Sequence, residues 1–202
     1  MDARERILHI AEEMFAKKGY DGTSVNEIAK EAEVNKALIY YYFESKKDLL
    51  NTLFFEFVKL IEKEITYLYN EKNDEMSMRH IEKSSLLMVD FVVRKKKLIK
   101  IAVIESLKEG EEDNIIIALS DMLMANEIES IRERYKQKGW NIEKDEKLLM
   151  VTEFFTGIMP ILTFAIFGDV FGEKHELSKA QMKEMFVQAF LNTHIEYHKN
   201  KL

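Results

Sequence analysis

Apolar residues recur at helical spacing along nearly the whole chain. In the first part, Ile7, Ala11 and Phe15 fall on one helical face, and Lys17 and Lys18 before a glycine suit a helix end. The same spacing continues in three further segments before residue 70. We therefore expect helices over 3–18, from 23 or 24 to 32, over 36–43, and from 45 to about 70.

The second and third of these helices are separated by a very short joint. Ser24 and Glu27 form a capping box, in which each side chain accepts a hydrogen bond from the other residue's backbone N–H at a helix start. Asn35 is a favourable cap for the next helix. Only Glu33 and Val34 lie in the turn between them. This arrangement is typical of a helix-turn-helix.

Beyond residue 70, helical segments alternate with short polar joints, near 76–93, 96–108, 114–138, 145–167 and 178–199. One proline and seven glycines in 202 residues favour long helices over a sheet. The predicted fold class is all-α. We expect an N-terminal three-helix helix-turn-helix domain, residues 1–48, joined through a long helix to a larger helical ligand-binding and dimerisation domain, residues 49–202.

The segment 145–167 is apolar on nearly every side. A helix without a polar face must be covered all round, and a single chain of this size covers only part of it. Pairing of this segment and the last helix, 178–199, with a second copy would give a four-helix interface. We therefore expect a homodimer, with a monomeric core as the alternative.

Gly157 and Pro160 interrupt this apolar helix, and a proline kink could open a cavity beside it. Glu153 and Glu105 stand in apolar surroundings, and each could meet a cationic ligand or, more simply, reach solvent or a lysine. We expect a small, mostly apolar effector here, although each residue could also be plain core. The candidate lining residues are Phe91, Ile104, Leu107, Met122, Phe154, Phe155, Ile158 and Met159.

The charge balance is unusual for a protein that binds DNA. The formal net charge is −6, and residues 1–50 hold eight Lys/Arg against ten Asp/Glu. Affinity for phosphate depends on where cations and helix N-termini point, so we expect a small basic face and not a basic protein. Cysteine is absent, which is compatible with a cytoplasmic location, and the N-terminus has no apolar signal segment.

The candidate DNA-reading residues lie at the helix starts of the helix-turn-helix. A groove-reading helix needs its N-terminal end at the DNA, where N–H groups meet phosphate and side chains reach base edges. Lys36 can reach a guanine edge or a phosphate, and the small Ala37 permits close approach. The prediction requires that Lys36 and Tyr41 lie at the surface. The expected DNA contacts are Thr23, Ser24, Asn35, Lys36, Ala37, Tyr40, Tyr41, Tyr42 and Lys46.

Residues 4–54 resemble the DNA-binding domain of TetR-family transcriptional regulators. The resemblance rests on F-x-x-x-G-Y at 15–20, on T-[ST]-V-x-x-I-A at 23–29, and on A-x-V-x-x-x-x-[LI]-Y-x-[HY]-F-x-[ST]-K-x-x-L at 32–49. It implies a homodimer that binds a palindromic operator, usually represses, and is released by a small ligand. Glu33 replaces a glycine that is common in the family's turn, which predicts a reshaped or slightly strained turn. Ala37 and Tyr42 also depart from common family residues, so the operator sequence does not carry over.

Other chemistry finds little support in the sequence. No nucleophile and base pair, phosphate loop or dinucleotide fingerprint occurs, so we expect no enzyme and no cofactor. His194 and His198 are spaced as a possible metal pair but lack the glutamate of a known motif, so no metal site is expected. We expect no membrane span, although 148–171 is apolar. The main alternative function is a helical protein-interaction module without DNA binding.

Overall fold

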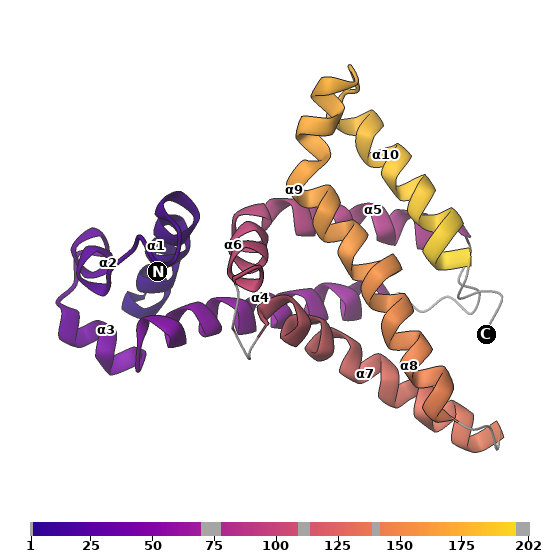
Figure 1. Cartoon of the computed structure of the whole chain (residues 1–202), viewed down its shortest axis with the longest axis horizontal. Helices are drawn as coiled ribbons and strands as arrows, with labels where there is room; N and C mark the ends of the chain where they lie inside the picture. Colours follow the sequence, from indigo (N-terminus) through magenta and orange to yellow (C-terminus); the bar gives the residue numbers. More distant parts are fainter. Residues whose placement is uncertain (1, 70–77, 109–113, 139–141, 197–202) are drawn as a thin grey trace. The chain divides into compact units, whose positions relative to one another are not determined.

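The computed structural model describes residues 2–69, 78–108, 114–138 and 142–196, and every regular element in these ranges is a helix (Figure 1). The predicted all-α fold class is confirmed. In chain order the elements are α1 (Ala3–Lys18), α2 (Val25–Glu31), α3 (Lys36–Tyr42), α4 (Lys46–Tyr69), α5 (Met78–Arg94), α6 (Lys96–Ser106), α7 (Ile115–Lys138), α8 (Ile142–Thr152), the π-helical η1 (Glu153–Ile158), α9 (Met159–Lys174), α10 (Lys179–Phe190) and the π-helical η2 (Leu191–Ile195).

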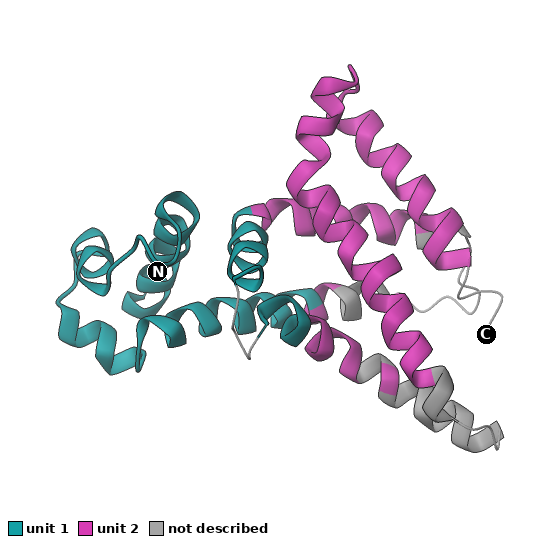
Figure 2. Ribbon diagram, viewed as in Figure 1, with its two compact units in different colours: residues 1–61, 97–119 teal, residues 62–96, 120–202 magenta. Residues whose placement is uncertain are grey.

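The chain folds into two compact units, coloured separately in Figure 2. Unit 1 contains residues 1–61 and 97–119, and unit 2 contains residues 62–96 and 120–202. Unit 1 thus adds the first part of α4, most of α6 and the start of α7 to the three N-terminal helices. The division at residues 48 and 49 that the sequence suggests remains a prediction about domains.

Unit 1 has a core of large side chains from several helices. Ile7 and Phe15 of α1, Ile28 of α2 and Ile39 of α3 are almost completely buried. Leu49 and Val58 of α4 and Ile99 of α6 are equally buried and belong to the same unit. The apolar spacing of the sequence therefore becomes one continuous core, which fixes α3 against α1 and α2.

Unit 2 has a smaller fully buried centre where α5 meets α10 and η2. Val89, Val187 and Leu191 form it, with Phe164 and Phe186 stacked beside it at 4.3 Å between ring centroids. Ion pairs join the same helices at the surface. Lys96 Nζ lies 2.8 Å from Asp169, and Lys183 Nζ lies 2.9 Å from Asp90. These contacts fix α5, α9 and α10 as one layer.

The apolar segment predicted as one interrupted helix is longer and is divided into α8, η1 and α9. The interruption takes the form of a π-helical stretch. Pro160 has no N–H to donate, and just before it the N–H of Met159 donates to the carbonyl of Phe154, five residues back. The wider turn lets the helix continue through the proline. Gly157 lies in the middle of η1 and is buried.

The same segment is the one described helix that is long and apolar enough to cross a membrane by length and composition. Over Glu146–Lys174 its best 18-residue window has a mean hydropathy of 1.8, and 17% of that window is buried in the chain. A core helix of a soluble protein passes the same test, so this is weak evidence for a span. The low burial does mean that much apolar surface of this helix is uncovered in a single copy.

Candidate nucleic-acid interface

The start of α2 is fixed by the predicted capping box. The Ser24 hydroxyl accepts from the N–H of Glu27, and the Glu27 carboxylate accepts from the backbone N–H and the hydroxyl of Ser24. Lys18 Nζ lies 2.7 Å from the same carboxylate. The hydrogen bond from Lys18, followed by those from Ser24, lowers the pKa of Glu27 to about 2. The carboxylate is therefore ionised at neutral pH, and its negative charge interacts favourably with the positive N-terminal end of α2.

The turn between α2 and α3 keeps the geometry that the family usually gives to glycine. Glu33 has φ of +52°, in the left-handed region. The N–H of Val34 bonds the carbonyl of Ala29 at 2.9 Å, and Arg6 Nε donates to the carbonyl of Ala32 at 2.9 Å. Of the two outcomes expected for a non-glycine residue here, the structure has the strained turn and not a reshaped one. Arg6, which the sequence did not single out, helps to hold it.

Asn35 caps α3 as predicted, because its Oδ1 accepts from the N–H of Leu38 at 2.7 Å. Ile39 and Phe43 are buried and anchor the helix on its inner side. The other face is exposed from its first residue. Asn35, Lys36 and Ala37 are exposed, so the N-terminal end of α3 is open to solvent.

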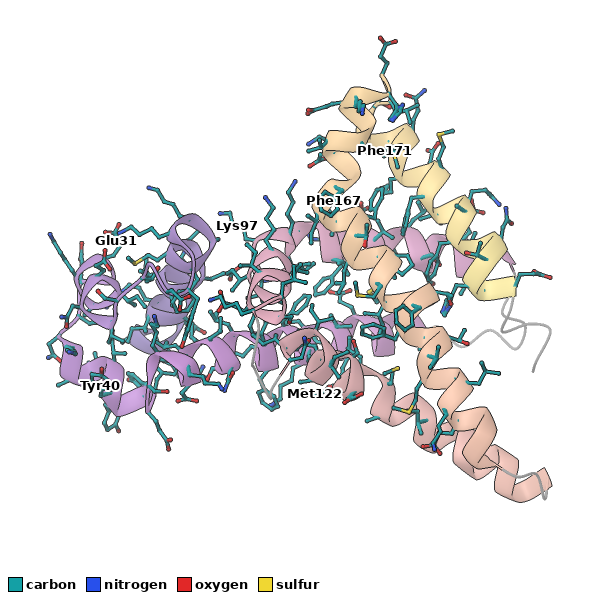
Figure 3. The ribbon with its side chains drawn as sticks, in the orientation of Figure 1. Glu31, Tyr40, Lys97, Met122, Phe167 and Phe171 are labelled. Carbon is teal, nitrogen blue, oxygen red and sulfur yellow. The ribbon has the colours of Figure 1, made fainter. Side chains whose placement is uncertain are left out.

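The three consecutive tyrosines all reach the surface. Tyr41 is 79% exposed, Tyr40 48% and Tyr42 38%, and Figure 3 shows Tyr40 among the side chains that project from α3. The Nζ of Lys36 lies 5.7 Å from the centroid of the Tyr40 ring, and the rings of Tyr41 and Tyr42 meet edge to face. The condition set from the sequence, that Lys36 and Tyr41 lie at the surface, is met.

Thr23 is a correction to the expected set of contacts. Its side chain is only 1% exposed, and its hydroxyl donates to the carbonyl of Gly19 at 2.9 Å, with the carbonyl of Met14 at 3.3 Å. The N–H of Thr23 donates to the carbonyl of Tyr20. Thr23 therefore ties the end of α1 to the start of α2 and faces the protein. Ser24, one residue later, is exposed and stays in the expected set.

The ammonium group of Lys46 has partners within the protein. Its Nζ donates to the carbonyls of Tyr20 and Thr23 at 3.0 and 3.1 Å, and lies 4.1 Å from the centroid of the Tyr20 ring. These contacts hold the start of α4 to the loop between α1 and α2. Lys46 therefore positions α4, and its contact with DNA remains a prediction.

The end of α6 contributes contacts to unit 1 that the sequence did not reveal. Lys108 Nζ lies 2.7 Å from the carboxylate of Asp21 and also bonds Glu105. The hydrogen bond from Lys108 lowers the pKa of Asp21. Partial burial opposes the charged form of Lys108, but the bonds to Asp21 and Glu105 outweigh it and raise the pKa of Lys108. Glu105 thus meets a neighbouring lysine, the simpler of its two expected roles.

Comparison with known proteins agrees with this geometry. Residues 7–53 match the family of bacterial regulatory proteins described as the tetR family. The chain is 39% identical over 64 residues to an uncharacterized HTH-type transcriptional regulator of Lactococcus lactis. It is 44% identical over 46 residues to the biofilm operon icaADBC negative transcriptional regulator IcaR of Staphylococcus aureus. Residues 7–53 therefore form a DNA-binding domain of the tetR type.

The curated relatives match only part of this chain. The match covers 32% and 23% of this chain, and the chain spans about a third or less of the length of these relatives, 33% and 25%. Solved structures extend the likeness of the fold. A transcriptional regulator from Aquifex aeolicus aligns over 93% of this chain and 97% of its own, with a TM-score of 0.65 and 22% identity. FadR from Bacillus subtilis in complex with stearoyl-CoA aligns over 94% and 98%, with a TM-score of 0.58 and 19% identity.

The residues expected to line an effector site fall in both units. Ile104 and Leu107 belong to unit 1 and are exposed, as is Phe155 of unit 2, whereas Phe91 is buried. Met122, labelled in Figure 3, lies on α7 and is partly exposed. Phe154, Ile158 and Met159 are half-buried on η1 and at the start of α9. The lining set remains a prediction. His198 lies outside the described residues.

Proposed function

We propose that this chain is a ligand-responsive transcriptional repressor that binds a palindromic DNA operator as a homodimer. The N-terminal end of α3 enters the major groove, and a small, mostly apolar effector releases the DNA. The tetR-type DNA-binding domain supports regulation of transcription, and the name of the IcaR relative supports repression.

The exposed leading edge of α3 is the observation that carries the proposal. Asn35, Lys36 and Ala37 are all exposed at the one place where free N–H groups and the helix dipole favour a phosphate. Tyr41 presents a hydroxyl for phosphate and a ring for sugar. Ile39 and Phe43 hold this edge outward from the opposite side of the same helix. The proposed contacts are Ser24, Asn35, Lys36, Ala37, Tyr40, Tyr41 and Tyr42.

Operator selection from random DNA, followed by gel-shift titration at several salt concentrations, tests the proposal. Lys36→Ala removes a cation from the edge and is expected to weaken binding by about 10-fold, with a shallower dependence on salt. Tyr41→Ala is expected to weaken binding by a similar factor, and Tyr41→Phe by less, because the ring remains. The size of these effects follows the roughly 1–3 kcal/mol typical of one good contact.

Lys63→Ala is the matched control, because Lys63 is an exposed lysine on α4, distant in sequence from the reading helix. It removes the same charge and is expected to leave operator affinity nearly unchanged. Equal losses for Lys36→Ala and Lys63→Ala would mean that DNA responds only to total charge. Selection that yields no enriched sequence, with no salt-dependent affinity, would favour a helical protein-interaction module instead.

The proposed dimer rests on uncovered apolar surface in unit 2. Phe167, Val170 and Phe171 of α9 and Met185 of α10 are each more than half exposed in the single chain. Figure 3 labels Phe167 and Phe171 on α9. Adjacent exposed apolar side chains on paired helices favour burial against a second copy. Two copies could then place their reading helices about 34–36 Å apart, one turn of DNA.

The effector part of the proposal can be tested without knowing the ligand. The stearoyl-CoA bound by one structural neighbour makes a long-chain acyl-CoA a reasonable first probe for an apolar site. An effector must bind the DNA-free state more tightly than the DNA-bound state. It is therefore expected to raise the melting temperature of the free protein and to weaken operator binding in the same concentration range. A compound that does only the first is a ligand but not an inducer.

A further inference from the structure

A buried polar cluster joins the two π-helical segments of unit 2. Glu153 of η1 and His194 of η2 are 9% and 6% exposed. His194 Nε2 lies 3.4 Å from Glu153 Oε2, and His194 Nδ1 lies 2.9 Å from the hydroxyl oxygen of Thr156. Neither the proposed DNA contacts nor the candidate lining of the effector site includes Glu153, Thr156 or His194.

The hydroxyl of Thr156 determines which imidazole nitrogen carries a proton. Thr156 Oγ1 donates its one hydrogen to the carbonyl of Thr152, at 2.8 Å. The oxygen can then only accept from His194, so Nδ1 must be protonated. In a neutral ring of this tautomer Nε2 is a bare acceptor, and it points at the carboxylate of Glu153.

An acceptor nitrogen and a carboxylate oxygen at this separation repel each other unless a proton lies between them. Burial makes the repulsion more costly, because water cannot screen it. We propose that Glu153 and His194 share one proton, and that this proton makes the packing of η1 against η2 sensitive to pH. With the shared proton on the carboxyl group, the pair consists of a neutral acid and a neutral imidazole. With the proton on Nε2, it is a buried ion pair. The pair holds one shared proton in both cases.

The backbone around the pair is built for this close approach. A Cβ added at Gly157 would lie 2.9 Å from His194 Cε1 and 3.3 Å from Glu153 Oε2, so the glycine makes the space that the ring occupies. The ring of Phe190 lies 5.0 Å from that of His194 and covers it from the preceding turn. π-Helical turns are rare and concentrate at functional positions, and here two of them meet at the shared proton.

The other charged groups on the adjoining helices have surroundings of their own. Lys183 of α10 is paired with Asp90 of α5. Lys147 of α8, Glu184 of α10 and Glu196 after η2 are exposed, and Asp169 of α9 is paired with Lys96 and Lys179. Glu146 of α8 is half-buried and, like Glu196, takes part in further contacts. Within the described part of unit 2, Glu153 is therefore the buried carboxylate that faces His194.

The sign of the pH effect follows from counting protons. An unfolded histidine releases its proton near pH 6.5, whereas an unfolded glutamate is already ionised there. Above that pH the folded pair still holds a proton that the unfolded chain has lost. Folding stability therefore falls as the pH rises, until the pair itself gives up the proton. Between about pH 5 and 6 both states hold one proton, and the contribution is constant.

Glu153→Gln gives a sharp test, because the amide N–H₂ donates to Nε2 at every pH without a shared proton. We expect the melting temperature of the full-length wild type to fall by about 3–6 °C more than that of Glu153→Gln between pH 6.5 and 8.5. At pH 8.5 the variant should equal or exceed the wild type. If Glu153 has a purely structural role, Glu153→Gln should instead lose the same amount of stability at every pH. That result would overturn the proposal.

Two further measurements keep the proposal testable if Glu153→Gln folds poorly. His194→Gln should also lose the extra pH dependence, so an unchanged slope contradicts the shared proton. In the wild type, the ring nitrogens of His194 can be observed by NMR, with this variant for assignment, and Nδ1 is expected to stay protonated throughout. A ring with bare Nδ1, or strong stabilisation by added Zn²⁺ that chelation reverses, would also overturn it. These readouts involve no DNA, so their failure leaves the regulator proposal untouched.

Discussion

The two units of the chain bury their apolar side chains to different extents. In unit 1, large side chains such as Phe15, Ile7 and Ile28 are buried almost completely, and every helix of the unit contributes to one core. In the described part of unit 2, the comparable centre is Val89 and Val187, while several phenylalanines stay more than half exposed. One unit completes its core within the chain, and the other leaves an apolar face without a partner.

The exposed aromatic residues of the two units consequently have different meanings. Tyr41 and Tyr42 in unit 1 carry hydroxyl groups, lie on the same helix as Lys36 and form a surface suited to a polyanion. Phe167 and Phe171 in unit 2 have no polar group, and the surface they form is suited to a second apolar surface. Exposure alone does not distinguish the two cases, whereas the polar tips of the tyrosines do.

Substitution of one phenylalanine in each unit tests this contrast most strongly. Phe15→Ala empties a fully buried position and is expected to reduce the free energy of unfolding by about 3–5 kcal/mol, at any protein concentration. Phe167→Ala removes a ring that is 59% exposed and should cost less than about 0.5 kcal/mol in dilute monomer. Urea unfolding at two protein concentrations measures both. Equal, concentration-independent losses would mean that α9 is covered within its own chain.

A charge placed on the uncovered face is the next test. Phe167→Glu would put a carboxylate into the proposed dimer interface in both copies, and is expected to raise the dimer dissociation constant by at least about 30-fold, or 2 kcal/mol. Sedimentation velocity measures it. Thr163→Glu, at an exposed position one turn earlier on α9, shows how far the interface extends. A dimer that tolerates Phe167→Glu must use another surface.

The sequence predicts unit 1 well because its signals are local. The capping boxes, the cap at Asn35 and the alternation of buried residues such as Ile28 and Ile39 lie within single helices, and the structure confirms them. The sequence did not reveal the internal partners of Thr23 and Lys46, for a physical reason. Both belong to the family motif, but their partners are backbone carbonyls of the loop between α1 and α2, which no periodicity reveals.

Unit 2 was predictable in its helices but not in their details. The apolar segment around Pro160 was correctly expected to be interrupted, but a π-helical turn depends on how backbone bonds reorganise around a missing N–H, and sequence spacing does not encode that choice. The meeting of Glu153 with His194 joins residues 41 positions apart and depends on Gly157 between the helices. Contacts of this kind require the packed structure.

The turn between α2 and α3 allows a test with a smaller expected effect. It measures how much the strained backbone of Glu33 costs in stability beside α3. Glu33 has a positive φ, so Glu33→Gly is expected to stabilise the chain by about 0.5–1 kcal/mol, the relief of strain less the added freedom of the unfolded chain. Glu31→Gly, two residues earlier and labelled in Figure 3, makes the same chemical change at the last residue of α2 and should destabilise by up to about 1 kcal/mol, the cost in a helix interior. Urea unfolding should give effects of opposite sign.

The two units also carry the same capping box with different chemistry. At the start of α2 the partner of Ser24 is Glu27, and at the start of α10 the partner of Ser178 is Gln181. The hydroxyl of each serine donates to its partner at 2.8 Å. The geometry is therefore shared, and of these two boxes the one at the start of α2 carries a charge, held by Lys18.

This difference predicts the smallest effect, a pH dependence that arises from the capping box of α2. Glu27 has a pKa near 2 when folded and an ordinary value of 4.5, so its ionised form stabilises α2 above about pH 4.5, and this contribution disappears as the pH falls toward 2. Glu27→Gln keeps the box but not the charge. The wild type should therefore be slightly more stable than the variant at pH 7, with the gap closing between pH 4.5 and 2. Urea unfolding along this pH series measures the gap, which stays small because the carboxylate is exposed. Gln181→Glu is the control, because no lysine among the described residues bonds its capping box, and it should show a weaker pH dependence. If the difference in stability between the wild type and Glu27→Gln stays constant with pH, Glu27 contributes through its hydrogen bonds alone.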